Sequence, residues 1–253
     1  MTVLDAVISG VIQGLTEFLP VSSSGHLVLL HNILGLKEPQ LTFDIFLHLG
    51  TMISILIFFV KDIADIVLRN RRMLTLFILA CIPTFIIGFA FKDAVEELFA
   101  SPAIVGCMMV VNGVWLLAVH SIATKKQKYH AVSRFDSVII GIAQGVAVIP
   151  GISRSGTTMG TGLMLGLEGS DAVRFSFLLS VPAILGASAV KFAQIWDGRI
   201  AVDTVPFIAG GLVALFTGLL AIFLLLKAVK ASKLWAFGAY CILVGGITVF
   251  LLW

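Results

Sequence analysis

Charge is the scarcest property of this 253-residue sequence. Only 12% of its residues are charged, while 59% are hydrophobic and the mean hydropathy is +1.08. An ordinary soluble domain has about 25% charged residues. A water-soluble globule of this size needs more polar surface, and a disordered chain needs fewer apolar residues. These values predict an all-α polytopic membrane protein with little mass outside the bilayer.

Paired cysteines and long basic runs are missing as well. Cys81, Cys107 and Cys241 stand alone in apolar stretches, which excludes a secreted disulfide scaffold and a CxxC motif. No Lys or Arg precedes Lys37, so we expect no basic region of a signal peptide there. The 17 Lys and Arg residues stand in short clusters between apolar runs. That pattern is typical of membrane topology and not of nucleic-acid binding.

Six apolar runs are long enough to cross a hydrocarbon core of about 30 Å at about 1.5 Å per residue. They lie near 41–60, 72–91, 102–122, 170–194, 206–227 and 233–253. Two further apolar regions, 3–34 and 135–167, are broken by PVSSSGH and PGISRSG, so each half is too short to span. We interpret them as re-entrant helical hairpins, whose turns are tolerated at membrane depth only inside protein or beside a wet cavity. A solvent-exposed turn between two poorly formed spans is the alternative.

Basic residues divide unequally between the two sides of this arrangement. By the positive-inside rule, the linkers with most of them are cytoplasmic. These linkers hold Lys61, Arg69, Arg71, Arg72, Lys125, Lys126, Lys128, Arg134, Arg174, Lys227, Lys230 and Lys233. The opposite side receives Lys37, Lys92, Lys191 and Arg199. An alternating path then requires the first hairpin to enter from outside and the second from inside, with both termini outside.

The two broken segments also repeat one another. A shift of 131 residues superposes 10–26 on 141–157 with six identities in 17 positions. The same shift carries the first three spans onto the last three, so we predict one membrane domain, 1–253, with internal repeats of about 1–122 and 132–253. Three spans per repeat require an inverted second repeat, as in many secondary transporters. The two turns should then meet near the pseudo-two-fold axis, with Ser23 and Arg154 at equivalent positions.

Polar residues inside these segments form the candidate site. An ionisable group at membrane depth costs roughly 2.5–3.5 kcal/mol and is a functional candidate by default, which selects Glu17 and Arg154. An ion pair that only locks the hairpins together is the alternative. Arginine, hydroxyls and helix N-termini are groups that bind phosphate, and we expect new helices to begin at His26 and Thr157, directly after the two turns. His26 lies at the same turns, whereas His48 and Asn112 are interpreted as packing groups within spans. The candidate substrate ligands are Gln13, Ser22, Ser24, Ser153, Ser155, Gly156 and Thr157.

The stretches QGLTEFLPVSSSGH (13–26) and PGISRSG (150–156) resemble the two signature motifs of the bacterial undecaprenyl-diphosphate phosphatase family, also known for bacitracin resistance. The resemblance covers essentially the whole chain. It implies a multi-pass enzyme of the bacterial inner membrane that hydrolyses undecaprenyl diphosphate to undecaprenyl phosphate and inorganic phosphate, recycling the lipid carrier for peptidoglycan synthesis. The charge map lets the first hairpin open outward, so we expect the active site to face the outer side.

The resemblance also implies roles for single residues. Glu17, Ser23, His26 and Arg154 fall on positions implicated in catalysis. The first motif of the family is Glu/Gln-x-x-x-Glu, and here it begins with Gln13, which leaves one carboxylate at this place. A divalent cation, Mg or Ca, is implied, with Glu17 as its candidate ligand.

Three functions stay open at this point. A phosphatase needs Arg154 together with a nucleophile, for which Ser23, His26 and an activated water are the candidates. An inverted-repeat transporter or flippase of a prenyl phosphate lipid needs the charge but no nucleophile. A non-catalytic lipid-binding protein is the third. The expected partners are a prenyl diphosphate lipid and the bilayer, without nucleic acid, and a homodimer is one of the open oligomeric states.

Overall fold

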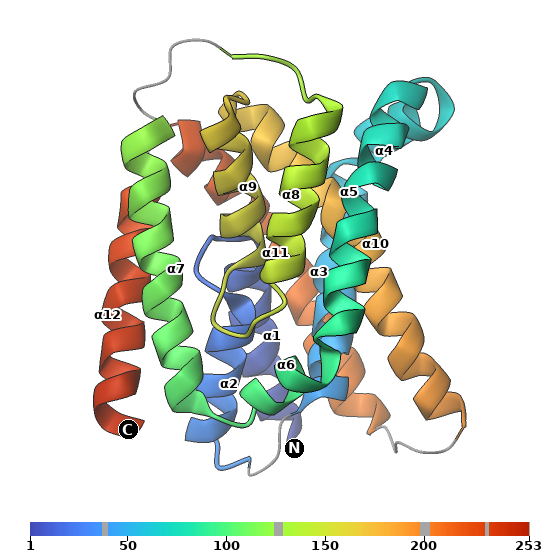
Figure 1. Cartoon of the computed structure of the whole chain (residues 1–253). Helices are drawn as coiled ribbons and strands as arrows, with labels where there is room; N and C mark the ends of the chain where they lie inside the picture. The colour runs from blue at the N-terminus through green and yellow to red at the C-terminus, as the bar shows by residue number, and fades with distance from the viewer. Residues whose placement is uncertain (37–39, 124–128, 198–202, 231–232, 253) are drawn as a thin grey trace.

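The computed structural model describes residues 1–36, 40–123, 129–197, 203–230 and 233–252. Over these ranges the regular secondary structure is entirely helical (Figure 1). The helices are α1 (Val3–Phe18), α2 (Ser23–Ile33), α3 (Leu41–Phe58), α4 (Val60–Leu68), α5 (Arg71–Ala90), α6 (Lys92–Leu98), α7 (Pro102–Ala123), α8 (Arg134–Val146), α9 (Arg154–Leu165), α10 (Gly169–Trp196), α11 (Thr204–Lys230) and α12 (Leu234–Leu252).

Six of these helices are long and apolar enough to cross a membrane, namely α3, α5, α7, α10, α11 and α12. They match the six predicted runs to within three residues at each end, and residue 253 of the last run lies outside the described residues. The prediction of a polytopic, all-helical membrane protein is therefore confirmed.

Each broken segment forms two short helices joined by a turn. In Figure 1 the pair α1 and α2 occupies the lower half of the molecule, the pair α8 and α9 occupies the upper half, and the two turns meet at middle height. Ser155 Oγ donates a hydrogen bond to the carbonyl oxygen of Leu19 at 3.2 Å, which joins one turn directly to the other. The turns are thus in contact, as predicted, while their entry from opposite faces of a membrane stays a prediction.

The two hairpins begin with the same capping arrangement. The Thr2 side chain caps α1 and exchanges hydrogen bonds with Asp5, and Ser133 caps α8 with Asp136 in the same way. Such a reciprocal box satisfies two of the free N–H groups at a helix start. Both pairs are related by the 131-residue shift, so the repeat extends to the local structure that starts each hairpin.

The second helix of each hairpin begins earlier than the sequence indicated. We expected new helices from His26 and Thr157, but α2 begins at Ser23 and α9 at Arg154. The cause is a hydroxyl cap: the side chain of the preceding serine, Ser22 or Ser153, accepts a hydrogen bond from the N–H group three residues later. Ser23 and Arg154 therefore each stand at the first helical position, next to unsatisfied N–H groups.

Each hairpin packs closely against a helix from the other half of the chain. A Cβ atom on Gly10 of α1 would clash with the backbone of Gly210 on α11, and one on Gly141 of α8 would clash with Ala80 on α5. The hairpin of the first half thus packs against a helix of the second, and the reverse holds for the other hairpin. Only glycine permits such approach of two backbones.

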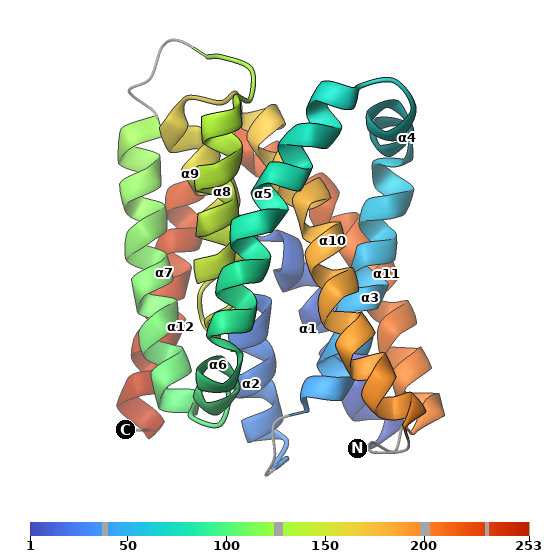
Figure 2. The ribbon, with the colours of Figure 1, turned by 45° about the vertical axis from the view of Figure 1, so that its right-hand side comes forward.

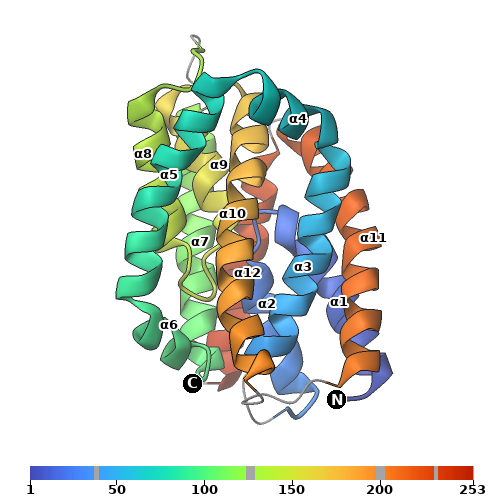
Figure 3. The ribbon, with the colours of Figure 1, turned by 90° about the vertical axis from the view of Figure 1, so that its right-hand side faces the viewer.

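The chain ends mark one end of the molecule. Both termini and α6 lie at one end in Figures 1, 2 and 3, and α4 lies at the other. Arg174 at the start of α10 pairs with Asp62 of α4 at 3.3 Å, which places two of the clusters assigned to the cytoplasm at the same end. Which end is cytoplasmic stays a prediction. Lys37, Lys125, Lys126, Lys128 and Arg199 of the charge map, and the side chains of Lys191 and Lys230, lie outside the described residues.

Candidate active site

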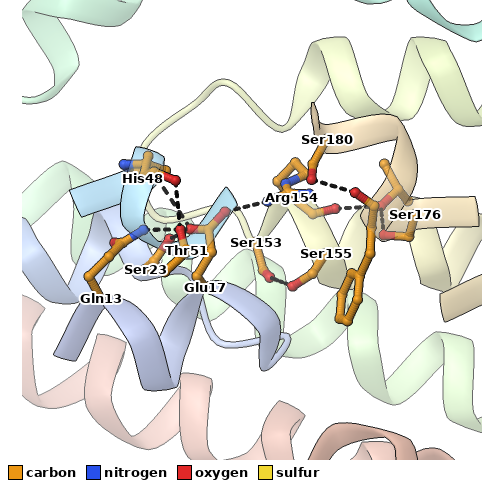
Figure 4. A network of polar contacts seen from close by, with 12 residues as sticks. Gln13, Glu17, Ser23, His48, Thr51, Ser153, Arg154, Ser155, Ser176 and Ser180 are labelled. Carbon is orange, nitrogen blue, oxygen red and sulfur yellow. Dashed lines mark hydrogen bonds and ion pairs between the residues drawn. The ribbon is translucent and has the colours of Figure 1, made fainter. Parts of the chain in front are cut away.

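Glu17 is the centre of a polar cluster in the last turn of α1. Its carboxylate is buried and contacts side chains from four helices (Figure 4). Oε2 accepts hydrogen bonds from Gln13 Nε2 at 3.0 Å and from Ser23 Oγ at 2.6 Å, and lies 3.4 Å from His48 Nε2. Oε1 pairs with Arg154 Nη2. The shared helix face of Gln13 and Glu17 is confirmed, and the two halves of the chain meet at one carboxylate.

Arg154 keeps part of its binding capacity free. Nη2 pairs with Glu17, whereas Nη1 is buried and has no hydrogen-bond partner among the residues that the structure describes. A guanidinium carries five N–H donors, and a buried donor without a partner costs roughly 1–3 kcal/mol. An ion pair that only locked the hairpins would have no use for such a group. An anion placed at Nη1 satisfies it.

A cavity of about 500 Å³ adjoins this ion pair. Its polar inner end is lined by Glu17, Ser23, Ser24, His48 and Arg154. Its walls from α3, α5 and α10 are mainly apolar and include Ile45, Phe85, Phe89, Ile184 and Val190. Lys92, Val95, Glu96 and Phe99 in and beside α6 line its other end. Because α6 lies beside the chain termini in Figures 2 and 3, the cavity runs from the hairpin turns toward that end.

Most of the other hydroxyl groups hold the turns together. Ser22 and Ser153 cap helices, and Ser153 Oγ and Ser155 Oγ lie 3.1 Å apart. The backbone at Gly156 packs against the first turn, since a Cβ there would lie 3.0 Å from Pro20 Cβ. These four residues and Thr157 are absent from the cavity lining, whereas Ser24 is part of it. Their assignment as substrate ligands stays a prediction.

His26 is not among the residues that line the cavity. Its Nδ1 lies 2.8 Å from the carbonyl oxygen of Ser22, and its Nε2 lies 2.8 Å from the hydroxyl of Tyr240 on α12. The two rings stack with centroids 5.6 Å apart. The structure therefore separates His26 from the Glu17–Arg154 pair, and its catalytic role stays a prediction.

Two residues of the site were underestimated from the sequence. His48 of α3 lines the cavity beside Glu17, and its position as an ionisable group inside a span was the available signal. Asn112 of α7 is buried, and its Nδ2 donates to the carbonyl oxygen of Pro20 at 3.1 Å. Its Oδ1 accepts from the N–H group of Ser153 at 3.0 Å. One amide thus ties the two turns to each other.

The Glu17 carboxylate is a suitable ligand for a hard cation that also binds phosphate oxygens of a substrate. Gln13 Nε2 donates to the Glu17 carboxylate, and Gln13 Oε1 is buried and has no hydrogen-bond partner among the described residues. Among the described residues, no group of three or more His, Cys, Asp and Glu side chains could hold a metal alone. Mg²⁺ is usually bound through one or two carboxylates together with substrate phosphates. The residues present fit that mode and do not form a complete protein cage.

Comparison with known proteins shows the family of the chain. Residues 6–247 match the family model described as bacitracin resistance protein BacA. A protein named undecaprenyl-diphosphatase from Halothermothrix orenii is 41% identical over 99% of this chain and 98% of its own length. Proteins of the same name from Carboxydothermus hydrogenoformans and Methanosphaera stadtmanae are 40% and 37% identical and are also aligned over nearly their full lengths.

Proposed function

The chain belongs to the bacitracin resistance protein BacA family, and we propose that it hydrolyses undecaprenyl diphosphate to undecaprenyl phosphate and inorganic phosphate. The observation that carries this proposal is the position of Arg154, Glu17 and Ser23 at the inner end of a cavity with apolar walls. A lipid diphosphate needs both features, because its head group is anionic and its prenyl chain is apolar. The product is the lipid carrier that peptidoglycan synthesis uses again.

Arg154 supplies the anion site. Its Nη1 has no partner within the described part of the chain, and a guanidinium binds two phosphate oxygens in a fork. Ser24 lines the same part of the cavity and adds a hydroxyl. Binding of the terminal phosphate here satisfies the buried nitrogen and draws the head group toward Glu17.

Ser23 and Glu17 supply the groups for attack on phosphorus. Ser23 Oγ donates to Glu17 Oε2 at 2.6 Å, so the carboxylate can accept the hydroxyl proton as the oxygen bonds to the terminal phosphorus. The bridging P–O bond breaks, and undecaprenyl phosphate leaves with that oxygen. A water then attacks the phosphorus of the phosphoserine and the Ser23 Oγ–P bond breaks. Protonated Glu17 returns its proton to Ser23 Oγ, and the water oxygen and both of its hydrogens leave with inorganic phosphate. Direct attack by a water held at Glu17 uses the same base. The separation of His26 from the cavity favours these two routes over attack by the imidazole.

A divalent cation, Mg or Ca, completes the proposal. Glu17, which lines the cavity, would hold it together with oxygens of the diphosphate. Its chemistry there is neutralisation of phosphate charge.

The cavity also suggests the side of the reaction. It runs toward the end of the molecule with both termini and α6, which the charge distribution assigns to the outside. We therefore infer an active site that opens to the outer face of the bacterial inner membrane.

Phosphate release from a prenyl diphosphate by the purified protein in detergent tests this function. We expect turnover by the wild type and its loss in Arg154→Ala and Glu17→Ala. Arg174→Ala is the matched control, since Arg174 pairs with Asp62 near the opposite end and should keep the activity. Binding of the lipid without phosphate release would indicate a carrier or flippase and contradict the phosphatase.

The nucleophile can be identified by trapping. With substrate labelled in the terminal phosphate, quenching during turnover in mildly alkaline SDS, which preserves both phosphoserine and phosphohistidine, should leave label on the wild type and none on Ser23→Ala. Label that persists in Ser23→Ala and disappears in His26→Gln would assign the attack to His26. Turnover by Ser23→Ala without any labelled protein would indicate direct attack by water.

A further inference from the structure

His48 contacts Glu17 from a third part of the chain. Its Nε2 lies 3.4 Å from Glu17 Oε2, and the ring lines the cavity (Figure 4). The other partners of the carboxylate come from the two hairpins, whereas His48 stands on the transmembrane helix α3. The sequence gives His48 no role, and the proposed reaction does not yet use it.

The orientation of the His48 ring is fixed from the opposite side. Nδ1 lies 2.7 Å from the carbonyl oxygen of Asp44, one turn earlier on α3. A carbonyl oxygen can only accept, so Nδ1 carries a proton and donates it. The second ring nitrogen then faces a carboxylate oxygen at an ion-pair distance of 3.4 Å, a contact that is attractive when Nε2 carries a proton. A backbone bond on one nitrogen and a carboxylate on the other is how a histidine is held in one orientation.

The proposed reaction makes this contact important for Glu17. Arg154 donates hydrogen bonds to the phosphate, and Ser23 gives its proton to the Glu17 carboxylate when its oxygen attacks phosphorus. Of the four partners of Glu17, only Gln13 and His48 neither bind phosphate nor react. These two must hold the carboxylate in place during the step, because a catalytic base acts only from a defined position.

We propose that His48 is a positioning residue that holds Glu17 against the cavity wall through Nε2. The inference rests on the proposed function and deepens it, since it assigns a role in the same reaction to α3. It also couples the site to a transmembrane helix outside both hairpins.

Three substitutions separate the two contacts of the ring. Glutamine places its amide nitrogen the same number of bonds from Cα as Nε2, so His48→Gln can still donate to Glu17 but loses the Nδ1 contact. Asparagine does the reverse, so His48→Asn keeps a donor for the Asp44 carbonyl and cannot reach Glu17. His48→Leu removes both donors at similar size. The asparagine variant is thus the matched control for the glutamine variant.

The test measures kcat and KM for phosphate release, with the thermal midpoint of each purified variant. We expect His48→Gln to stay within about threefold of the wild type, and His48→Asn and His48→Leu to lose about 10- to 100-fold in kcat with KM little changed. Equal activity of the asparagine and glutamine variants, or full activity of His48→Leu, would overturn the inference. An equal fall of kcat in all three variants would also overturn it. Wild-type turnover in the same experiment keeps the phosphatase proposal separate, since that proposal fails only if the wild type releases no phosphate.

Discussion

Replacement of Arg154 by lysine tests the site most directly, because it keeps the charge and removes the fork. Arg154 Nη2 pairs with Glu17 while Nη1 stays free for a ligand, so one side chain serves two acceptors at once. A lysine ammonium is a point charge that cannot reproduce the planar fork. We therefore expect Arg154→Lys to lose about two charge-assisted hydrogen bonds in the transition state. At roughly 1.5–3 kcal/mol each, the loss is about 3–6 kcal/mol, or roughly 10²- to 10⁴-fold in rate.

The assay is phosphate release under kcat/KM conditions, together with the thermal midpoint of the purified variant. Because lysine still neutralises the buried carboxylate of Glu17, we expect the thermal midpoint of Arg154→Lys to stay near that of the wild type. Arg154→Ala should lower it, since a buried carboxylate then lacks its cation. Arg174→Lys is the control for a general effect of the substitution. Turnover of Arg154→Lys within tenfold of the wild type would refute the reasoning and reduce Arg154 to a counter-ion.

Three further predictions concern the cation, the turns and the topology. Glu17→Gln should nearly abolish hydrolysis while lipid diphosphate still binds, and Gln13→Glu should stay active and require less Mg²⁺. A metal titration of activity checks both variants. Full activity of Glu17→Gln with unchanged metal dependence would make Glu17 structural. Asn112→Leu should lower kcat about tenfold or more, because both turns lose a hydrogen bond to one amide; kinetics beside the thermal midpoint measure it, and wild-type kcat would contradict it. In a protein without native cysteines, an impermeant reagent applied from outside should label Glu97→Cys and not Lys61→Cys, and the reverse pattern would contradict the assigned orientation.

The sequence was sufficient for the spans and for the meeting of the two turns. Hydropathy alone placed the six long helices, because each must bury its backbone polar groups within one apolar run. The contact between Glu17 and Arg154, 137 positions apart, followed from a different argument. The repeat made the turns equivalent, and equivalent inverted hairpins place their turns near one axis. Both inferences depend on patterns that extend over many residues.

Roles of single polar side chains could not be predicted in the same way. Ser22, Ser23 and Ser24 are three adjacent residues of the same type with different roles. Ser22 caps α2, Ser23 donates to Glu17, and Ser24 lines the cavity. The cap decides the outcome, because it starts α2 at Ser23 and thereby sets the direction of every following side chain. If α2 began at His26, as the sequence predicts, the His26 ring would project in a different direction from the one it has in the structure.

His48 shows the same limit inside a regular span. Its bond to the Asp44 carbonyl is a local i to i−4 contact, which the sequence allows and which makes the residue resemble a satisfied packing group. The second nitrogen meets Glu17 because α1 and α3 contact each other and both pack closely against α11, with Gly10 facing Gly210 and Gly50 facing Gly211. The site is therefore specified in part by glycines that have no side chain in it. These glycines set the distance between the helices. A larger residue at Gly50 would move His48 away from Glu17, although none of the polar residues that line the cavity would have been replaced.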